Sequence, residues 1–449
     1  MRDWLERRFS LSERGTSVRA EVRGGVVTFL AMSYIVFVQP SVLGAAGMDF
    51  GAVMVATCLA SALASLVMAF GANYPVALAP CMGENFFFVS VCAGAVTGSP
   101  VPWPAALAAV LVSGVLFLLL SAFRFREAIV ENLPLSLKHA IPAGIGLFIA
   151  FIGLQQGGLV APAPGSMVRL GDLSSGPALL TLGGLLLTGT LLALRIPGAI
   201  LWGILAATAA ALPLGLAEWH GIVSSPPSLS PVLLKLDVAS LLDAAMIPVV
   251  VIFLFMVLFD TVGTLVGVGQ QAGLMKDGKL ERAGRALFSD AVGTTAGALL
   301  GTSTVSAYIE SAAGVAAGAR TGLASVITAA GFLLAMFCYP LVRMVGGGVM
   351  IDGVSFHPIT APVLILVGSM MLRAAAHIPW DEPAEAIPAF LVIAGIPLTY
   401  SIADGLALGF VAYPLLRLLS GKGRQVPALV YAMALLLCGV FVMKALLRA

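Results

Sequence analysis

Residues 73–95 read NYPVALAPCMGENFFFVSVCAGA and residues 301–318 read GTSTVSAYIESAAGVAAG, and these two stretches decide the fold. Both are apolar enough for a membrane span, yet neither can form an uninterrupted helix. The two prolines of the first stretch lack the backbone N–H that a helix interior needs. In the second stretch, the Thr/Ser run at 302–306 favours an extended conformation. We expect each stretch to start extended and continue as a short helix. The first helix should begin near 82–84, and the second should lie near 309–318.

The composition of the whole chain indicates that lipid is its solvent. The chain has 449 residues, of which 59% are hydrophobic and 10% are charged, and its mean hydropathy is +1.03. Soluble domains carry about 25% charged residues, so side chains this apolar must face a lipid bilayer. The formal net charge of +2 argues against a nucleic-acid partner. The five cysteines form no CxxC motif, so we expect free thiols, no structural metal and no cofactor.

Apolar stretches of about 20 residues, the length that spans a bilayer, recur along the chain. They fall into two sets of seven, and a polar interval separates the sets. The approximate ranges are 22–43, 52–70, 75–96, 103–122, 138–156, 177–194 and 198–216, then 242–269, 284–300, 302–318, 321–344, 357–373, 385–417 and 427–447. Seven spans per set give the two halves opposite orientations. The sequence therefore predicts an all-α polytopic membrane protein with fourteen transmembrane segments arranged as a 7+7 inverted repeat.

The placement of lysine and arginine predicts the orientation of the chain. If the N-terminal tail, residues 1–21, is cytoplasmic, most basic residues between segments fall on the cytoplasmic side, including Arg124, Arg126 and Arg320. The sequence thus predicts a multi-pass protein of the inner cell membrane with a cytoplasmic N terminus. The overlong segment at 385–417, which contains a proline, leaves two alternatives. It crosses once and violates the rule, or it re-enters and returns.

Among the acids inside predicted spans, three are candidates for a functional site, namely Glu84, Asp260 and Glu310. An ionisable side chain at bilayer depth is costly and marks a functional site by default. Asn85 follows the first acid, and Ser306 lies one turn before the last. No lysine or arginine lies in these spans, so the acids must share protons, bind a cation or hydrogen-bond a ligand. The alternative is that they are locked into structural hydrogen bonds, and for Glu84 the two interpretations are evenly matched.

Further side chains complete the candidate site. Thr264 lies one helical turn after Asp260 on the same face, and Phe86 could stack on a flat ligand, although most aromatic residues in such a helix face lipid or neighbouring helices. Two short helices that start at membrane depth would direct free N–H groups and positive dipole ends into one cavity. The alternative is two ordinary helices kinked by proline and glycine. Asp290 and Asp352 are expected to cap or line loops.

Several long strings match one known family in order along the chain. They are GTSVRAEVRGGVVTFLAMSYIVFVQPSVLGAAGMD at 15–49, ANYPVALAPCMGEN at 72–85, FDTVGTLVGVGQQAGL at 259–274, GRALFSDAVGTTAGALLGTSTVSAYIESAAGVAAGARTGL at 284–323 and IPLTYSIADGLALGF at 396–410. From about residue 9 to 420, the sequence resembles the AzgA-like purine permeases of the nucleobase–cation symporter-2 (nucleobase/ascorbate transporter) family. Ordered matches of this length are far more specific than a single short motif.

The resemblance implies two domains built from both halves of the chain. A core domain would comprise segments 1–4 (22–122) and 8–11 (242–344), and a gate domain segments 5–7 (123–216) and 12–14 (345–449), with an external loop at 217–241. Substrate would bind between the domains, and proton symport is the usual coupling. Relatives often form homodimers. In relatives, the residues at the positions of Asn85, Asp260 and Glu310 contact the base or its coupled proton.

This chain departs from the family pattern at the first interrupted segment. Where relatives commonly read APGMGLNA, it reads APCMGENF, so Cys81 replaces a glycine, Glu84 an apolar residue and Phe86 an alanine. An added acid and a larger ring beside the cavity bear on which base is accepted. They do not bear on whether the protein is a transporter.

The sequence therefore predicts a secondary active transporter that imports a purine base, guanine, hypoxanthine or adenine, by proton symport. Asp260 and Glu310 are the predicted proton-coupling residues. One alternative is a transporter of the same fold for another nucleobase, such as xanthine or uracil. Another is a sulfate or bicarbonate exchanger, which would need positive charge where this chain has acids. A membrane enzyme would need a nucleophile–base pair or metal ligands, and a purely structural role would leave the buried acids without purpose.

Overall fold

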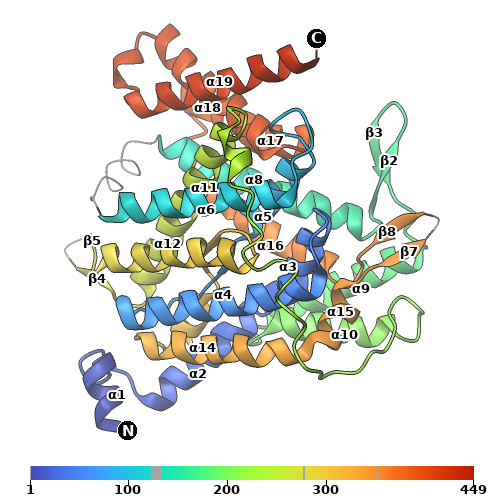
Figure 1. Cartoon of the computed structure of the whole chain (residues 1–449), viewed down its shortest axis with the longest axis vertical. Coiled ribbons are helices and arrows are strands. Elements are labelled where there is room, and N and C mark those ends of the chain that lie inside the picture. Colours follow the sequence, from blue (N-terminus) through green and yellow to red (C-terminus); the bar gives the residue numbers. More distant parts are fainter. Residues whose placement is uncertain (1, 123–133, 277–278, 352, 449) are drawn as a thin grey trace.

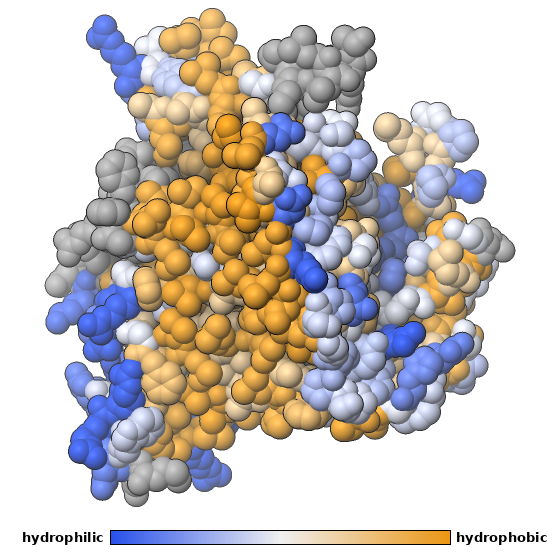
Figure 2. Space-filling view, viewed as in Figure 1, coloured by the Kyte–Doolittle hydropathy of each residue, from blue (hydrophilic) through white to orange (hydrophobic). Residues whose placement is uncertain are grey.

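The structure is a computed structural model that describes residues 2–122, 134–276, 279–351 and 353–448. Its long helices lie side by side and run across the view in Figure 1. Figure 2 shows a belt of hydrophobic residues through the middle of the visible face, with hydrophilic residues to its left and right. Among the described residues, 8 helical segments are long and apolar enough to cross a membrane, and four shorter apolar helices accompany them. The protein is therefore a helical polytopic membrane protein.

The first half of the chain is mainly helical and is interrupted by three short strands. Its elements are α1 (Arg2–Phe9), α2 (Val18–Met32), α3 (Tyr34–Gly44), α4 (Phe50–Gly71), β1 (Leu78–Pro80), α5 (Met82–Cys92), α6 (Trp103–Ala122), α8 (Leu135–Gln156), β2 (Val160–Ala163), β3 (Met167–Leu170), α9 (Gly176–Ala193) and α10 (Ala199–Ala211). Ser33 marks a bend between α2 and α3, and together these two helices form the first long apolar segment.

The second half has the same general pattern. Its elements are η1 (Ala239–Leu242), α11 (Met246–Gln271), β4 (Met275–Lys276), β5 (Lys279–Leu280), α12 (Ala283–Leu300), β6 (Val305–Ala307), α13 (Ser311–Ala316), α14 (Gly322–Ala335), η2 (Met336–Cys338), α15 (Tyr339–Gly346), β7 (Val349–Ile351), β8 (Val354–Phe356), α16 (Ala361–Met371), η3 (Leu372–His377), α17 (Pro383–Thr399), α18 (Ile402–Leu419), η4 (Gly423–Gln425) and α19 (Ala428–Arg448).

Helices from the two halves pack against each other. α4 lies against α12 and α14, α6 against α11 and α12, and α2 against α13 and α14. A second set of contacts joins α8 to α16 and α17, α9 to α10 and α16, and α18 to α17 and α19. Glycines allow the closest approaches, since a Cβ at Gly146 of α8 would lie 2.6 Å from the Gly368 carbonyl oxygen of α16. The fold thus depends on contacts between residues far apart in sequence.

The two interrupted segments form as predicted, and they also pair with each other. Strands β1 and β6 are antiparallel, with Leu78 opposite Ala307 and Ala79 opposite Ser306. β1 leads into α5, and β6 leads, through Tyr308–Glu310, into the six-residue helix α13. The prediction of two half-helices preceded by extended stretches is confirmed, whereas their pairing was not predicted.

Side-chain hydroxyls satisfy the backbone of these buried strands. The Leu78 N–H donates to Ser65 Oγ of α4 at 3.0 Å, and Ser65 Oγ donates to the Leu78 carbonyl at 3.2 Å. Thr294 Oγ1 of α12 donates to the Val305 carbonyl at 2.7 Å and accepts from the Val305 N–H at 3.3 Å. Non-helical backbone at membrane depth persists only where protein satisfies its polar groups, and these two reciprocal pairs do so on both strands.

The prediction of a single segment at 385–417 is wrong, because this stretch forms the two helices α17 and α18. Pro397 lacks the N–H for a helical hydrogen bond, Tyr400 takes a left-handed conformation at φ 55°, and Ser401 caps α18 by accepting from the Asp404 N–H. The helices form an antiparallel hairpin, since Tyr413 OH donates to Glu385 Oε1 at 2.9 Å. The hairpin is compatible with the alternative in which the segment re-enters and returns, which stays a prediction.

The N-terminal tail, predicted only as a tail, is packed against the helices. Phe9 at the end of α1 is buried with Leu11 and with Leu323 of α14. The Asn73 side-chain amide donates to the Phe9 carbonyl at 2.9 Å. The predicted cytoplasmic Arg124 and Arg126, and the predicted loop residue Asp352, lie outside the described residues.

Candidate functional site

Asp260 lies where α11 meets the β1–β6 pair. Its Oδ2 atom accepts a hydrogen bond from Ser306 Oγ of β6 at 2.9 Å and another from Cys81 Sγ at 3.2 Å. Cys81 is the N-cap residue of α5, in extended conformation and without a side-chain cap hydrogen bond. One carboxylate oxygen therefore joins the central helix to both interrupted segments.

Glu84 is buried in the first turn of α5, with 2% of its surface exposed. A carboxylate oxygen of Glu84, the Cys81 thiol sulfur and a carboxylate oxygen of Asp260 all lie within 4.8 Å of one another. An acid in the first turn interacts favourably with the positive end of the helix dipole. The structure therefore brings Glu84 and Asp260 together around one thiol.

Glu310 lies at the start of α13, on the other interrupted segment. It is the N-cap residue of this helix and is partly buried. Tyr34 OH, at the start of α3, donates to Glu310 Oε1 at 2.9 Å, and the Tyr34 ring lies 6.4 Å from the ring of Tyr308. Asp260 also acts electrostatically on Glu310. None of the ion pairs among the described residues involves Glu84, Asp260 or Glu310, so the acids carry no cationic counterpart.

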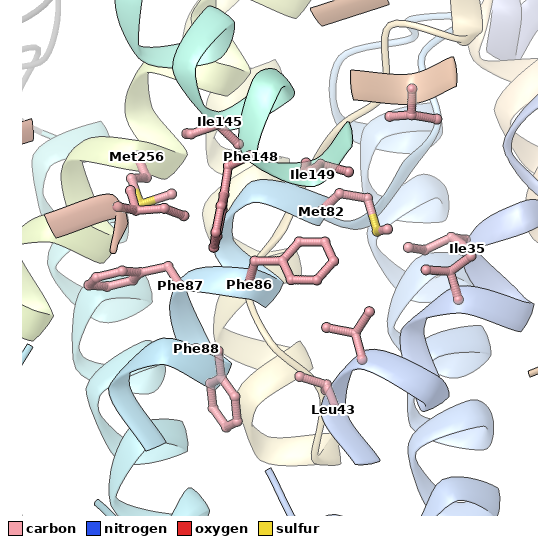
Figure 3. Packing of buried hydrophobic residues seen from close by; sticks show 14 of the residues in the cluster. Ile35, Leu43, Met82, Phe86, Phe87, Phe88, Ile145, Phe148, Ile149 and Met256 are labelled. Atoms are coloured by element: carbon pink, nitrogen blue, oxygen red, sulfur yellow. The ribbon is translucent and has the colours of Figure 1, made fainter. Parts of the chain in front are cut away.

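Thr264 and Phe86 lie at the edges of this group. Thr264 is 9% exposed. It lies on the same face of α11 as Gly267, where a Cβ would be 3.5 Å from Ile309 Cδ1, just before α13. Phe86 points into apolar packing between α5 and α8, where its ring centroid lies 6.2 Å from that of Phe148 (Figure 3). Phe86 thus lies where α5 contacts α8.

Asn85 occupies a different environment from Glu84, because adjacent residues on a helix point in different directions. Its side chain is fully buried and forms a reciprocal amide pair with Gln39 of α3, in which Gln39 Nε2 donates to Asn85 Oδ1 at 3.1 Å and Asn85 Nδ2 donates to Gln39 Oε1. Ser303 Oγ also donates to Asn85 Oδ1. No hydrogen bond among the described residues links Asn85 to the acids, so its contact with a ligand stays a prediction.

Asp290 is the acid that the sequence analysis placed wrongly, because it neither caps nor lines a loop. It is fully buried in the middle of α12, where Thr261 Oγ1 donates to its Oδ2 at 2.5 Å. The signal was present, since Asp290 lies inside a predicted span just as Asp260 does.

Cys81, Glu84 and Asp260 are the one group of metal-ligating residue types among the described residues whose ligand atoms all lie within 4.8 Å of one another. A closed structural zinc site uses four ligands, and this group offers three. The Cys81 thiol is also engaged as a hydrogen-bond donor to Asp260. The arrangement therefore fits acids that share hydrogens better than it fits a metal centre.

Taken together, the fold and the site have the features of a membrane transporter. Secondary transporters build their sites from interrupted helices at corresponding places in two halves of the chain. The overall fold is also found among solved structures. The transmembrane domain of the cyanobacterial bicarbonate transporter BicA matches with a TM-score of 0.62 and 16% identity, over 87% of this chain and 97% of that chain.

The sequence comparisons identify the family. The model of the Permease family matches residues 19–408. The guanine/hypoxanthine permease PbuG of Bacillus subtilis is 43% identical, over 95% of this chain and 96% of the relative. The adenine permease AdeP of Escherichia coli is 40% identical, over 96% and 94%. The chain belongs to the Permease family and is a transporter, not an enzyme.

Proposed function

We propose that this chain is a secondary active transporter that imports a purine base, guanine, hypoxanthine or adenine, together with protons. One observation carries the proposal. Three acids, Glu84, Asp260 and Glu310, gather at two paired breaks in membrane segments with no cationic partner among the described residues. The names of the relatives, which include guanine/hypoxanthine and adenine permeases, support a purine as the substrate.

The chemistry of the site matches the edge of a purine. The ring N–H groups of the base are donors, and the carboxylates of Asp260 and Glu310 are acceptors, with Glu84 as a third. Ser306 and Thr264 add hydroxyls that can donate or accept. Asn85 is held by its pair with Gln39 and is proposed to turn toward the base only in another conformation. Phe86 would stack on the base once it separates from Phe148.

Proton coupling follows from the cost of burying charge. A carboxylate without a cationic partner is expensive in a low-dielectric site, so protonating Asp260 or Glu310 lowers the free energy of the loaded, closed state. We propose that the proton enters with the base and leaves when the site opens to the cytoplasm. The base and the proton then move inward in the same cycle.

Alternating access is proposed as movement of a core domain (22–122 and 242–344) against a gate domain (123–216 and 345–449). The packing of α4, α12 and α14 as one set, and of α8, α16 and α17 as another, supports this division. We retain the inverted repeat of two sets of seven segments, with the α17–α18 hairpin as one re-entrant unit. The N terminus is proposed to be cytoplasmic in the inner cell membrane, and the protein to act as a homodimer like its relatives in the family.

The test is uptake of radiolabelled bases by a bacterium that lacks its own purine permeases. We expect accumulation of guanine, hypoxanthine or adenine, its loss with a protonophore, and weaker uptake of xanthine and uracil. Asp260→Asn should lower uptake at least about 100-fold, the size of losing a charge-assisted hydrogen bond of about 3 kcal/mol. Unlabelled sulfate or bicarbonate should not compete. Uptake that ignores the protonophore would reject proton coupling, and competition by an anion would favour an exchanger.

A further inference from the structure

Four side chains form a continuous hydrogen-bonded chain from the candidate site into the protein interior. Asp290 Oδ2 contacts Thr261 Oγ1 at 2.5 Å, Thr261 Oγ1 contacts Ser306 Oγ at 3.1 Å, and Ser306 Oγ contacts Asp260 Oδ2 at 2.9 Å. We call these four residues the relay. Asp260 is partly exposed, whereas the other three are fully buried. The relay therefore connects an acid at the site to an acid that solvent cannot reach.

The number of hydrogens in the relay does not match the number of contacts. Three oxygen–oxygen contacts need three hydrogens, but Thr261 and Ser306 carry one hydroxyl hydrogen each. If Thr261 donates to Asp290 and Ser306 donates to Asp260, the 3.1 Å contact between the two hydroxyls contains no hydrogen. Two buried oxygens would then face each other unsatisfied, which is costly in a low-dielectric interior.

One added proton resolves the mismatch. With the proton on Asp290, the chain of donors runs from Asp290 through Thr261 and Ser306 to an ionised Asp260. With the proton on Asp260, every hydrogen bond points the other way. Both arrangements use three hydrogens for three contacts, and they differ only in which acid is neutral and in the direction of two hydroxyls.

The surroundings of Asp290 favour a neutral acid. Asp260 and Glu84 are the acids that act on it electrostatically, and the Thr261 hydroxyl is its hydrogen-bond donor of regular geometry among the described residues. Its second oxygen, Oδ1, has no hydrogen-bond partner of regular geometry among the described residues. A buried carboxylate would normally gather several donors, so this sparse set suits a carboxylic acid.

We propose that Asp290 and Asp260 hold one proton in common through Thr261 and Ser306, and that Asp290 is the internal store for the transported proton. In a transfer, the proton leaves Asp290 Oδ2 for Thr261 Oγ1, the Thr261 hydrogen passes to Ser306 Oγ, and the Ser306 hydrogen passes to Asp260 Oδ2. One neutral acid replaces another, two hydroxyls reverse, and no electrons are exchanged.

This inference rests on the proposed proton symport and adds a residue to it. While the proton rests on Asp290, Asp260 is a carboxylate that can accept from an N–H group of the base. When the site opens to the cytoplasm, the proton returns to Asp260 and leaves together with the base, as the proposed symport requires. Asp290 would thus govern the charge of the site without touching the base, as a positioning and storage residue.

The transport test replaces the central hydroxyl in purified protein reconstituted into liposomes. Thr261→Val removes the hydroxyl and keeps the shape, and Thr261→Ser is the matched control that keeps the hydroxyl. We expect Thr261→Val to lower proton-driven accumulation of the base at least about 10-fold, while exchange of internal for external base, which needs no net proton movement, stays within about 2-fold. Thr261→Ser should retain both activities. Normal accumulation by Thr261→Val would overturn the proposal.

A spectroscopic test covers the case in which Thr261→Val loses both activities. The infrared difference spectrum between base-free and base-bound protein should contain a carboxylic-acid C=O band, and Asp290→Asn should abolish it. An unchanged band in Asp290→Asn would overturn the proposal. Wild-type protein without proton-driven accumulation would instead reject the proposed function, so the two failures are distinguishable.

Discussion

The half-helices α5 and α13 begin alike and end differently. Each follows a strand of the β1–β6 pair, and each carries an acid at its start, Glu84 in α5 and Glu310 at α13. α5 has 11 residues with the sequence MGENFFFVSVC, whereas α13 has 6 residues with the sequence SAAGVA. The difference lies in side-chain volume, and it decides what each half-helix can contact.

The short helix α13 packs closely against α2. A Cβ at Gly314 of α13 would lie 2.0 Å from Thr28 Oγ1 and 2.6 Å from the Gly24 carbonyl oxygen, both in α2. The bulky helix α5 instead contacts α8, because a Cβ at Gly83 of α5 would lie 2.9 Å from Ile145 Cγ2 of α8. Of the two short helices, α13 is therefore packed closely against α2, and α5 is the one that contacts α8.

The largest effect is expected where α13 touches α2. Gly314→Ala places a methyl group inside the contact distance of Thr28 Oγ1 and of the Gly24 backbone, and backbone cannot move aside. Overpacking costs about 1–3 kcal/mol and sometimes more, so we expect little folded protein. The measurement is the yield of monodisperse protein and its thermal unfolding temperature in detergent.

Gly183→Ala in α9 is the matched control, because a Cβ at Gly183 meets nothing within 4 Å. It should keep the wild-type yield and unfolding temperature, or raise the latter slightly, since alanine favours a helix over glycine by up to about 1 kcal/mol. If Gly314→Ala folds as well as this control, the close packing of α13 against α2 is not required for the fold.

A smaller effect is expected at the start of α5. There, Asn85 forms an amide pair with Gln39, whereas at the start of α13 Glu310 accepts a hydrogen bond from the Tyr34 phenol. Gln39→Leu leaves the buried Asn85 amide without its main partner, which costs about 1–3 kcal/mol. The double variant Gln39→Leu/Asn85→Leu removes both polar groups and should recover part of the lost stability. Thermal unfolding of the wild type, both single variants and the double variant measures this coupling. Additive losses would show that the pair does not hold α5.

The comparison of α5 with α13 also shows what sequence reasoning can reach. Prolines before α5 and the Thr/Ser run before α13 are local signals, and they predicted both breaks. An acid in an apolar run is also a local signal, so Glu84, Asp260 and Glu310 were chosen, and the structure brings them to one region around the β1–β6 pair.

What sequence reasoning missed depends on contacts across long distances in the chain. Nothing near Asn85 indicates that Gln39, 46 positions away, will occupy its amide. Asp290 was misplaced because its partner Thr261 lies 29 positions away on another helix. The α17–α18 hairpin was only one of two alternatives, for a different reason. Pro397 signalled a break, but the left-handed Tyr400 that reverses the chain is not a residue type that predicts a turn.

The smallest effect is expected at the far end of α13, which is anchored by the N-terminal segment. Arg23 Nε donates to the Ala317 carbonyl at 2.8 Å, and Thr16 Oγ1 donates to the Gly318 carbonyl at 3.2 Å. The same segment is tied to the connection between α11 and α12 by an ion pair between Arg14 and Glu281 at 2.7 Å. The Arg14 hydrogen bond, with the nearby positive charges of Arg282 and Lys276, holds the pKa of Glu281 below its ordinary value of 4.5.

This pKa direction sets the pH dependence of the anchor. Because the folded-state pKa is lowered, the ion pair stabilises the protein above the unfolded-state pKa, and the stabilisation is lost as the pH falls through the folded-state value. Both side chains are partly exposed, so the effect should be no more than about 0.5 kcal/mol. Glu281→Gln should therefore unfold at a slightly lower temperature than wild type at pH 7, and the difference should shrink at pH 4. A difference that grows on acidification would mean that Glu281 does not anchor the segment as a carboxylate, and that the far end of α13 is held by the Arg23 and Thr16 hydrogen bonds alone.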